Sequence, residues 1–111
     1  MNNYIQEDAK IFVAGHRGLA GSALVRKLRE MGYKNLLLRT RQEVDLLDSA
    51  AVEAFFDDQR PEYVFLAAAK VGGILANRDF PADFITQNLR IQSNVIENAY
   101  RSRVKRLLFL G

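Results

Sequence analysis

Three evenly spaced glycines, which join an apolar run to an amphipathic segment, constrain the fold of this chain more than any other feature. Residues 10–21 read KIFVAGHRGLAG, in which Ile11–Ala14 precedes Gly15, Gly18 and Gly21. A buried strand, a glycine turn and a helix form the context in which such spacing indicates dinucleotide binding. One glycine permits the tight turn, one lets the backbone approach a pyrophosphate, and one lets the helix pack on its strand. The alternative is a purely structural turn.

The amphipathic segment over residues 22–31 adds a second argument for a phosphate site. A helix N-terminus carries free N–H groups and partial positive charge, and both favour an anion. We therefore expect a pyrophosphate to lie against the following residues: Gly15, His16, Arg17, Gly18, Leu19, Ala20 and Gly21. For His16, the single histidine, a solvated side chain is the simpler interpretation, because one His builds neither a metal site nor a catalytic triad.

Four short apolar runs alternate with helical patterns and indicate an α/β fold. The runs are Ile11–Ala14, Leu36–Leu38, Tyr63–Leu66 and Leu107–Leu110. Runs that are apolar on both faces are typical of parallel strands covered by helices on both sides. The pattern predicts a Rossmann-type doubly wound parallel sheet, of which this chain holds the first four strands, in the order 3-2-1-4, with three intervening helices. The fourth strand would leave an unpaired apolar edge, so we expect the fold to be incomplete in this chain.

Helical spacing between the runs predicts which side chains face the core. The first stripe is Leu19, Ala23, Leu24, Leu28 and Met31. Asp48 or Ser49 caps the second helix, whose inward face is Ala51, Val52, Phe55 and Phe56. The third helix runs from about Pro81 to Arg101, with the stripe Phe84, Ile85, Leu89, Val95, Ile96 and Ala99. On it, Asn88 and Asn94 are expected to face solvent, with Asn88 as the alternative inward donor.

Composition narrows the class of protein. The 111 residues form one domain at most, with 49% apolar and 26% charged residues, which is ordinary for a globular chain. A net charge of +3 without a clustered basic face argues against a nucleic-acid partner. The absence of cysteine excludes a disulfide framework and a thiolate metal site, and we expect a cytoplasmic protein with no metal. No run is long enough to span a membrane, and we expect a flexible tail over residues 1–9 before a domain over 10–111.

Two arginines directly after the second apolar run favour NADP(H) over NAD(H). At this position an acidic residue binds the ribose 2′-hydroxyl of NAD, whereas an arginine accommodates a 2′-phosphate. Arg39 and Arg41 stand here, and the first acidic residue after the run is Glu43. Arg17, in the glycine loop, is a third candidate, since a guanidinium fork matches phosphate geometry. The alternative is that these arginines are merely solvated.

Two further segments are candidates for the rest of the cofactor site. Asp45 would accept a hydrogen bond from an adenine amino group while Leu46 packs on the ring; alternatively they are a helix-terminal Asp and a core Leu. The small side chains of Ala67, Ala68 and Ala69 would let the backbone approach a cofactor, or they simply pack a tight turn. Val71–Gly73 would extend this surface toward a substrate.

The chain lacks a recognisable catalytic pair. Hydride transfer on such a scaffold needs a general acid or base over the nicotinamide. None of the four tyrosines has a lysine four residues further on; they are Tyr4, Tyr33, Tyr63 and Tyr100. We therefore predict no catalytic residue within these 111 residues.

Several segments together resemble the GDP-L-fucose synthases, a group within the extended short-chain dehydrogenase/reductase family. They are AGHRGLAGSALVRKL at 14–28, LRTRQEVDLLD at 38–48, LAAAKVGGILAN at 66–77, FPADFITQNLRIQSNVIENAY at 80–100 and KRLLFLG at 105–111. The resemblance implies NADP(H)-dependent conversion of a nucleotide sugar, GDP-4-keto-6-deoxy-D-mannose, to GDP-L-fucose. It also implies a homodimer formed through the helix over 81–101.

The resemblance assigns site residues as well. It places the pyrophosphate on Gly15–Gly21, the 2′-phosphate near Arg17, Arg39 and Arg41, adenine on Asp45 and Leu46, and the ribose side on Ala67–Ala69. It makes Leu110 and Gly111 the start of a last cofactor-contacting loop. The family's catalytic residues lie beyond the equivalent of Gly111, so we expect an inactive N-terminal part. The alternatives are a non-catalytic dinucleotide-binding module and part of another nucleotide-sugar epimerase or dehydratase of the extended family.

Overall fold

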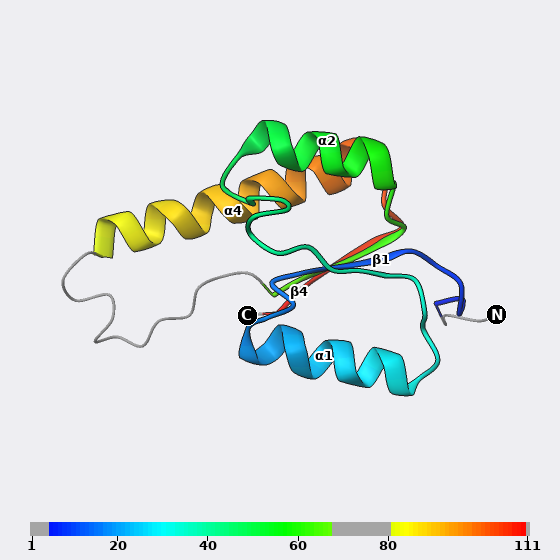
Figure 1. Cartoon of the computed structure of the whole chain (residues 1–111). Helices are drawn as coiled ribbons and strands as arrows, with labels where there is room; N and C mark the ends of the chain where they lie inside the picture. Colours follow the sequence, from blue (N-terminus) through cyan, green and yellow to red (C-terminus); the bar gives the residue numbers. More distant parts are fainter. Residues whose placement is uncertain (1–4, 68–80, 111) are drawn as a thin grey trace.

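The computed structural model of the chain describes residues 5–67 and 81–110. Its elements are, in order, β1 (Ile11–Ala14), α1 (Leu19–Glu30), β2 (Leu36–Leu37), α2 (Ser49–Gln59), β3 (Tyr63–Leu66), α4 (Pro81–Arg101) and β4 (Arg106–Phe109). Every strand pairing is parallel, and α1 covers one face of the sheet while α2 and α4 cover the other (Figure 1). The predicted doubly wound α/β fold is confirmed.

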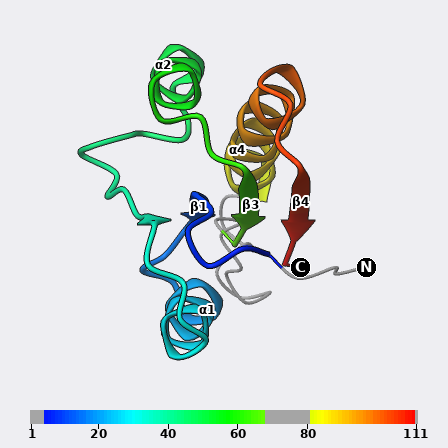
Figure 2. The same cartoon turned by 90° about the vertical axis from the view of Figure 1, so that its right-hand side faces the viewer.

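The strands lie in the order β2-β1-β3-β4 (Figure 2), so the predicted order 3-2-1-4 is wrong. β1 is interior, and Ile11 pairs with both Leu36 of β2 and Tyr63 of β3. β2 has two half-buried residues, whereas β3 is buried from Val64 to Leu66. A two-residue strand offers too few backbone groups to serve two neighbours, so β3 takes the interior place beside β1.

The strand boundaries differ from the prediction by one residue at two places. β2 ends at Leu37 rather than Leu38, and β4 runs from Arg106 to Phe109 rather than from Leu107 to Leu110. β4 pairs with β3 and forms an edge of the sheet, where Phe109 is half exposed. An edge strand is covered on fewer sides, so its side chains are less buried than those of β1.

Side-chain alternation along β1 divides the core into two layers. Val13 packs toward α1 with Val25, whereas Phe12 packs toward α2 and α4. The Phe12 ring centroid lies 4.6 Å from that of Phe55 and 5.8 Å from that of Phe56 on α2. These tilted and edge-on geometries are favourable for aromatic pairs. The aromatic cluster fixes α2 above the centre of the sheet.

The prediction for α2 is confirmed. Asp48 is the N-cap, and its carboxylate accepts hydrogen bonds from the N–H groups of Ala50 and Ala51. Val52, Phe55 and Phe56 are the buried residues of this helix, and Ala51 is half-buried.

The predicted apolar stripe of α1 is wrong at both of its ends and at Ala23, which is exposed. Leu19 is 92% exposed and Met31 is 54% exposed, while the residues that pack are Gly21, Val25 and Leu28. The helix begins at Leu19 rather than at residue 22, so Leu19 lies in its first turn, where it lines a cavity described below. Met31 is the C-cap and lies past the last packed turn.

The third predicted helix, α4, has the expected bounds but a different inward face. Val95 and Ala99 are buried as predicted, whereas Ile85 and Leu89 are more than half exposed. Asn94 is buried, so the prediction that it faces solvent is wrong. The reason is a hydrogen bond to another loop, described below, which compensates the burial of its amide. No helix in the described ranges is long and apolar enough to cross a membrane.

The segment before β1 contacts the domain. Tyr33 donates a hydrogen bond from its hydroxyl to the carbonyl of Ile5 (2.9 Å), and Asn35 donates from Nδ2 to the carbonyl of Asp8 (2.7 Å). Ala9 is buried. Residues 5–9 therefore lie against the connection between α1 and β2, while the domain boundary at residue 10 stays a prediction.

Candidate functional site

A cavity of about 780 Å³ opens beside the carboxyl ends of β1 and β3. Ligands of open parallel sheets bind at this edge, and the volume suits a small molecule or cofactor. The walls come from the loop after β1 (Gly15, His16, Arg17, Gly18), the first turn of α1 (Leu19, Ala20), the loop between β2 and α2 (Arg39, Thr40, Arg41, Gln42, Val44, Asp45, Leu46, Leu47), Ala67 after β3, and Gln87 and Ile91 of α4. Residues far apart in the sequence thus meet in one place.

The glycine loop is shaped by its backbone. Gly15 has φ of +88°, in the left-handed region that favours glycine, and the N–H of Gly18 donates to the carbonyl of Gly15 (3.1 Å). A Cβ at Gly21 would collide with that same carbonyl oxygen. Gly21 is buried and does not line the cavity; it lets the start of α1 approach the end of β1. Two of the three glycine roles expected from the spacing are therefore visible.

The N-terminus of α1 forms the part of the cavity wall most suited to an anion. Gly18 is the N-cap, no side chain caps the helix, and the first turn contains no acidic residue. The first N–H groups of a helix have no partner within the helix, and they lie at the positive end of its dipole. This combination is the chemistry of a phosphate site.

The opposite wall, the loop between β2 and α2, is shaped by side chains. Glu43 accepts a hydrogen bond at Oε1 from the N–H of Thr40 (2.7 Å), and the N–H of Glu43 donates to Oγ1 of Thr40 (3.3 Å). The bond from the Thr40 backbone is the main cause that lowers the pKa of the Glu43 carboxyl. Arg39 donates to the carbonyl of Leu38 (3.1 Å), and its guanidinium carbon lies 5.4 Å from the ring centroid of Phe55. Arg39 is therefore anchored.

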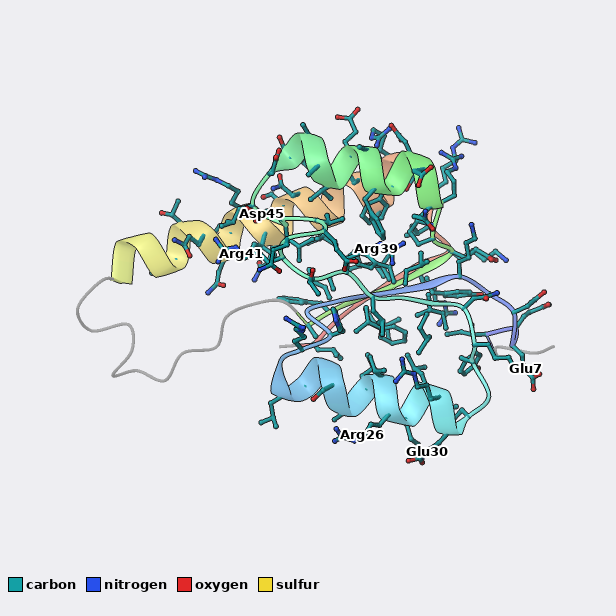
Figure 3. All side chains as sticks on the ribbon, viewed as in Figure 1. Glu7, Arg26, Glu30, Arg39, Arg41 and Asp45 are labelled. Atoms are coloured by element: carbon teal, nitrogen blue, oxygen red, sulfur yellow. The ribbon has the colours of Figure 1, made fainter. Side chains whose placement is uncertain are left out.

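Arg41 is held more loosely than Arg39. Its Nε lies 4.0 Å from Oδ1 of Asp45, and 70% of the Arg41 side chain is exposed. Such a pair contributes little to stability, so the guanidinium is available to an anionic ligand. Figure 3 shows Arg39, Arg41 and Asp45 on the same side of the sheet as α2, whereas Arg26 lies on the far side of α1.

The charge in the cavity is carried by arginines rather than by histidine. Burial is the main cause that lowers the pKa of His16 below 6.5, and the charge of Arg17 lowers it further. Glu43 acts in the opposite direction. The imidazole is therefore mainly neutral at pH 7, while Arg17 and Arg41 are charged and exposed. The guanidinium groups of these arginines and the uncapped N-terminus of α1 together provide hydrogen-bond donors for phosphate groups.

Most of the residues predicted from the sequence meet at this cavity. Leu110 does not line it; its N–H donates to the carbonyl of Leu66 (3.0 Å) and continues the pairing of β4 with β3. The remaining predicted positions lie outside the described residues: Ala68, Ala69, Val71–Gly73 and Gly111.

Six cavity residues were missed: Thr40, Gln42, Val44, Leu47, Gln87 and Ile91. The first four lie between or beside predicted positions in one loop, and that adjacency was a usable signal. Gln87 and Ile91 stand one helical turn apart on α4, so they share a face. Their place in the wall depends on how α4 docks, and no local motif encodes that.

Comparison with known proteins places the chain in a family context. Residues 11–111 match the model of the NAD dependent epimerase/dehydratase family. GDP-L-fucose synthase 1 of Arabidopsis thaliana is 64% identical over 105 residues, which are 95% of this chain and 32% of that protein. The chain thus spans about a third of the length of this relative.

Solved structures agree with this context. MlghC, a GDP-mannoheptose C4 reductase from Campylobacter jejuni with NADP bound, superposes with a TM-score of 0.92 at 50% identity, over 97% of this chain and 32% of that one. A GDP-L-fucose synthetase from Naegleria fowleri bound to NADP superposes with a TM-score of 0.80 at 29% identity, over 95% of this chain and 32% of that one.

Proposed function

The chain belongs to the NAD dependent epimerase/dehydratase family, and from this premise we propose that it is the NADP(H)-binding N-terminal part of a GDP-L-fucose synthase. The observation that carries the cofactor assignment is that Arg17, Arg39 and Arg41 line one cavity together with an uncapped helix N-terminus. This donor set fits a dinucleotide that carries an additional 2′-phosphate. Similar structures named as NADP-bound support the same assignment.

Each wall of the cavity then has a proposed role. Residues 15–20 hold the pyrophosphate against the start of α1, and the three arginines face the 2′-phosphate. Asp45 and Leu46 hold adenine, and Ala67 borders the ribose. Gly21 supports the loop from behind. For Leu110 and Gly111 the proposed cofactor contacts rest on the family resemblance alone. For Ala68 and Ala69 they rest on the resemblance and on the small size of the side chains.

The proposed reaction is the epimerisation and reduction of GDP-4-keto-6-deoxy-D-mannose to GDP-L-fucose by the intact protein. When bound, NADPH supplies the hydride. This chain's contribution is to bind and orient that cofactor, and we propose that the acid–base residues and the sugar site belong to other parts of the enzyme. Residues 10–111 would then be the N-terminal part of its cofactor domain, inactive alone.

A homodimer through α4 is part of the proposal. Its support is a set of exposed apolar side chains along that helix: Ile85, Leu89, Ile96 and Tyr100. Such a stripe is more apolar than a solvated helix face requires. Sedimentation of the intact protein would show a dimer, and Leu89→Glu would shift it toward monomer; an unshifted dimer would place the interface elsewhere.

Titration of the intact protein with NADPH and NADH, followed by turnover of GDP-4-keto-6-deoxy-D-mannose, tests the function. We expect tighter binding of NADPH and formation of GDP-L-fucose. Equal affinity for the two cofactors would contradict the 2′-phosphate assignment. Cofactor binding without turnover of this sugar would contradict the substrate alone.

A second candidate is a reductase of a GDP-linked heptose. It is favoured by the 50% identity to MlghC, a GDP-mannoheptose C4 reductase. The cavity described here is on the cofactor side and is compatible with both substrates. Competition between the GDP-4-keto-6-deoxy-hexose and a GDP-4-keto-heptose in the intact protein would distinguish them.

A further inference from the structure

Asn94 is a buried polar residue on the helix face that packs against the core. It is 7% exposed, and it lies between the core residues Ile91 and Val95. A buried amide without a partner is strongly unfavourable, so its hydrogen bonds show what it does. Its Nδ2 donates to the carbonyl of Leu46 (2.8 Å), which is 48 positions away in the sequence.

The carbonyl that Asn94 binds belongs to the loop between β2 and α2, which forms one wall of the cavity. Hydrogen bonds within that loop are local: Val44 N–H donates to the carbonyl of Thr40, and Leu47 N–H donates to Oδ1 of Asp45. Local bonds fix the shape of the loop but not its distance from the rest of the domain. The bond from Asn94 ties the loop to α4.

The two elements joined by this bond are both walls of the cavity. Leu46 and Leu47 line it from the loop, and Gln87 and Ile91 line it from α4. Gln87, Ile91 and Asn94 recur at i, i+4 and i+7, so they lie on one face of the helix. Asn94 therefore sets the separation of two walls without being a lining residue itself.

Asn98, one helical turn further along α4, is the comparison for Asn94. The Nδ2 of Asn98 donates to the carbonyl of Asn94 (2.8 Å), and Arg101 donates to Oδ1 of Asn98 while pairing with Asp57 of α2 (2.9 Å). The pair of Arg101 with Asp57 joins α4 to α2. Asn98 resembles Asn94 in burial and helix face, but its described bonds do not reach the cavity loop.

We propose that Asn94 is a positioning residue for adenosine binding, acting through the carbonyl of Leu46. This inference rests on the proposed function, because it takes the loop between β2 and α2 to be the adenosine wall. Removing the donor should let the wall move away and weaken every ligand that contains adenosine. Because Arg39 and Arg41 remain, discrimination between NADPH and NADH should persist.

The test uses Asn94→Leu in the intact protein, with Asn98→Leu as the matched control on the same helix. Binding of adenosine 2′,5′-bisphosphate, NADPH and NADH is measured by calorimetry. We expect N94L to weaken all three about tenfold, the effect of one lost buried hydrogen bond, with the NADPH/NADH ratio unchanged. N98L should lower the melting temperature and leave the three affinities within about twofold.

Three results would decide against the proposal. Wild-type affinities in N94L, or equal losses in N94L and N98L, would overturn it. If N94L does not melt cooperatively, Asn94→Ser carries the same test, since its hydroxyl cannot reach the Leu46 carbonyl; failure of both to fold would assign Asn94 to stability alone. If the wild-type protein itself does not bind the bisphosphate, the proposed function fails rather than this inference.

Discussion

The two loops that line the cavity are built by different means. The loop after β1 is formed by backbone: a positive φ at Gly15, a close approach at Gly21 and the bare N-terminus of α1. The loop after β2 adds side-chain bonds to its backbone turns, with Thr40 and Glu43 bonded to each other and Asn94 donating to the loop from α4. Backbone N–H groups donate hydrogen bonds to any phosphate, whereas side chains discriminate between ligands. We therefore expect the loop after β1 to supply affinity for the pyrophosphate and the loop after β2 to discriminate between cofactors.

The largest effect on stability and cofactor binding should come from a substitution at the loop after β1. Gly21→Ala places a Cβ against the carbonyl of Gly15, so α1 must move away from β1. We expect a loss of about 3 kcal/mol in the free energy of unfolding, and loss of cofactor binding. At Gly18 an added Cβ would meet the same carbonyl oxygen at 3.5 Å, an ordinary contact, so Gly18→Ala is the control. Equal denaturation midpoints for the two variants would contradict the assigned role of Gly21.

The next largest effect should come from the loop after β2, and it should affect NADPH binding but not NADH binding. Replacing Arg39 and Arg41 together by Ala removes two cations from the cavity wall. NADPH affinity should fall roughly a hundredfold while NADH affinity changes little, because charge-assisted bonds to a phosphate are strong. Arg26→Ala, on the far side of α1, is the control. A parallel loss of NADH affinity would mean that this loop does not choose the cofactor.

A smaller effect is expected where the side-chain loop is loosely paired. Asp45→Asn removes the charge that faces Arg41 at 4.0 Å in an exposed position. The free energy of unfolding should change by less than about 0.5 kcal/mol, as for exposed ion pairs in general. Urea denaturation measures it. A loss above about 1.5 kcal/mol would show that Arg41 is held rigidly by this pair.

The smallest effect concerns His16 in the glycine loop. Its pKa is lowered from 6.5, chiefly by burial, so the neutral form prevails above pH 6.5. His16→Gln should therefore leave NADPH affinity at pH 7.5 within about twofold, because a neutral group is replaced by another. Proton NMR of the histidine in the intact protein should give a pKa below 6.5. A higher value would make His16 a cation of the phosphate site.

The sequence predicted the loop after β1 more completely than the loop after β2. The role of Gly15 and Gly21 is local, since a turn between strand and helix needs them whatever surrounds it, and the prediction placed this loop correctly. Arg39 and Arg41 were identified as candidate site residues because they follow a strand. Their contacts could not be predicted from that position. Asn94 was placed toward solvent, because a polar residue on a helix has no local sign of a partner 48 positions away.

The strand order and the α1 stripe failed for a similar reason. β2 became an edge strand because it is short, and the three-leucine run gave no sign that pairing stops after Leu37. Leu19 fits a helical stripe by spacing, yet it lies in the first turn, beside the cavity. Periodicity describes a helix in isolation, whereas burial depends on where the neighbouring strands end.

The central claim is that this cavity recognises an adenosine 2′-phosphate. Calorimetric titration of the intact protein with adenosine 2′,5′-bisphosphate and with 5′-AMP isolates that group, because the two ligands share all other atoms of the adenosine half. The arginines predict that the bisphosphate binds at least about tenfold more tightly. Equal affinities would contradict the account.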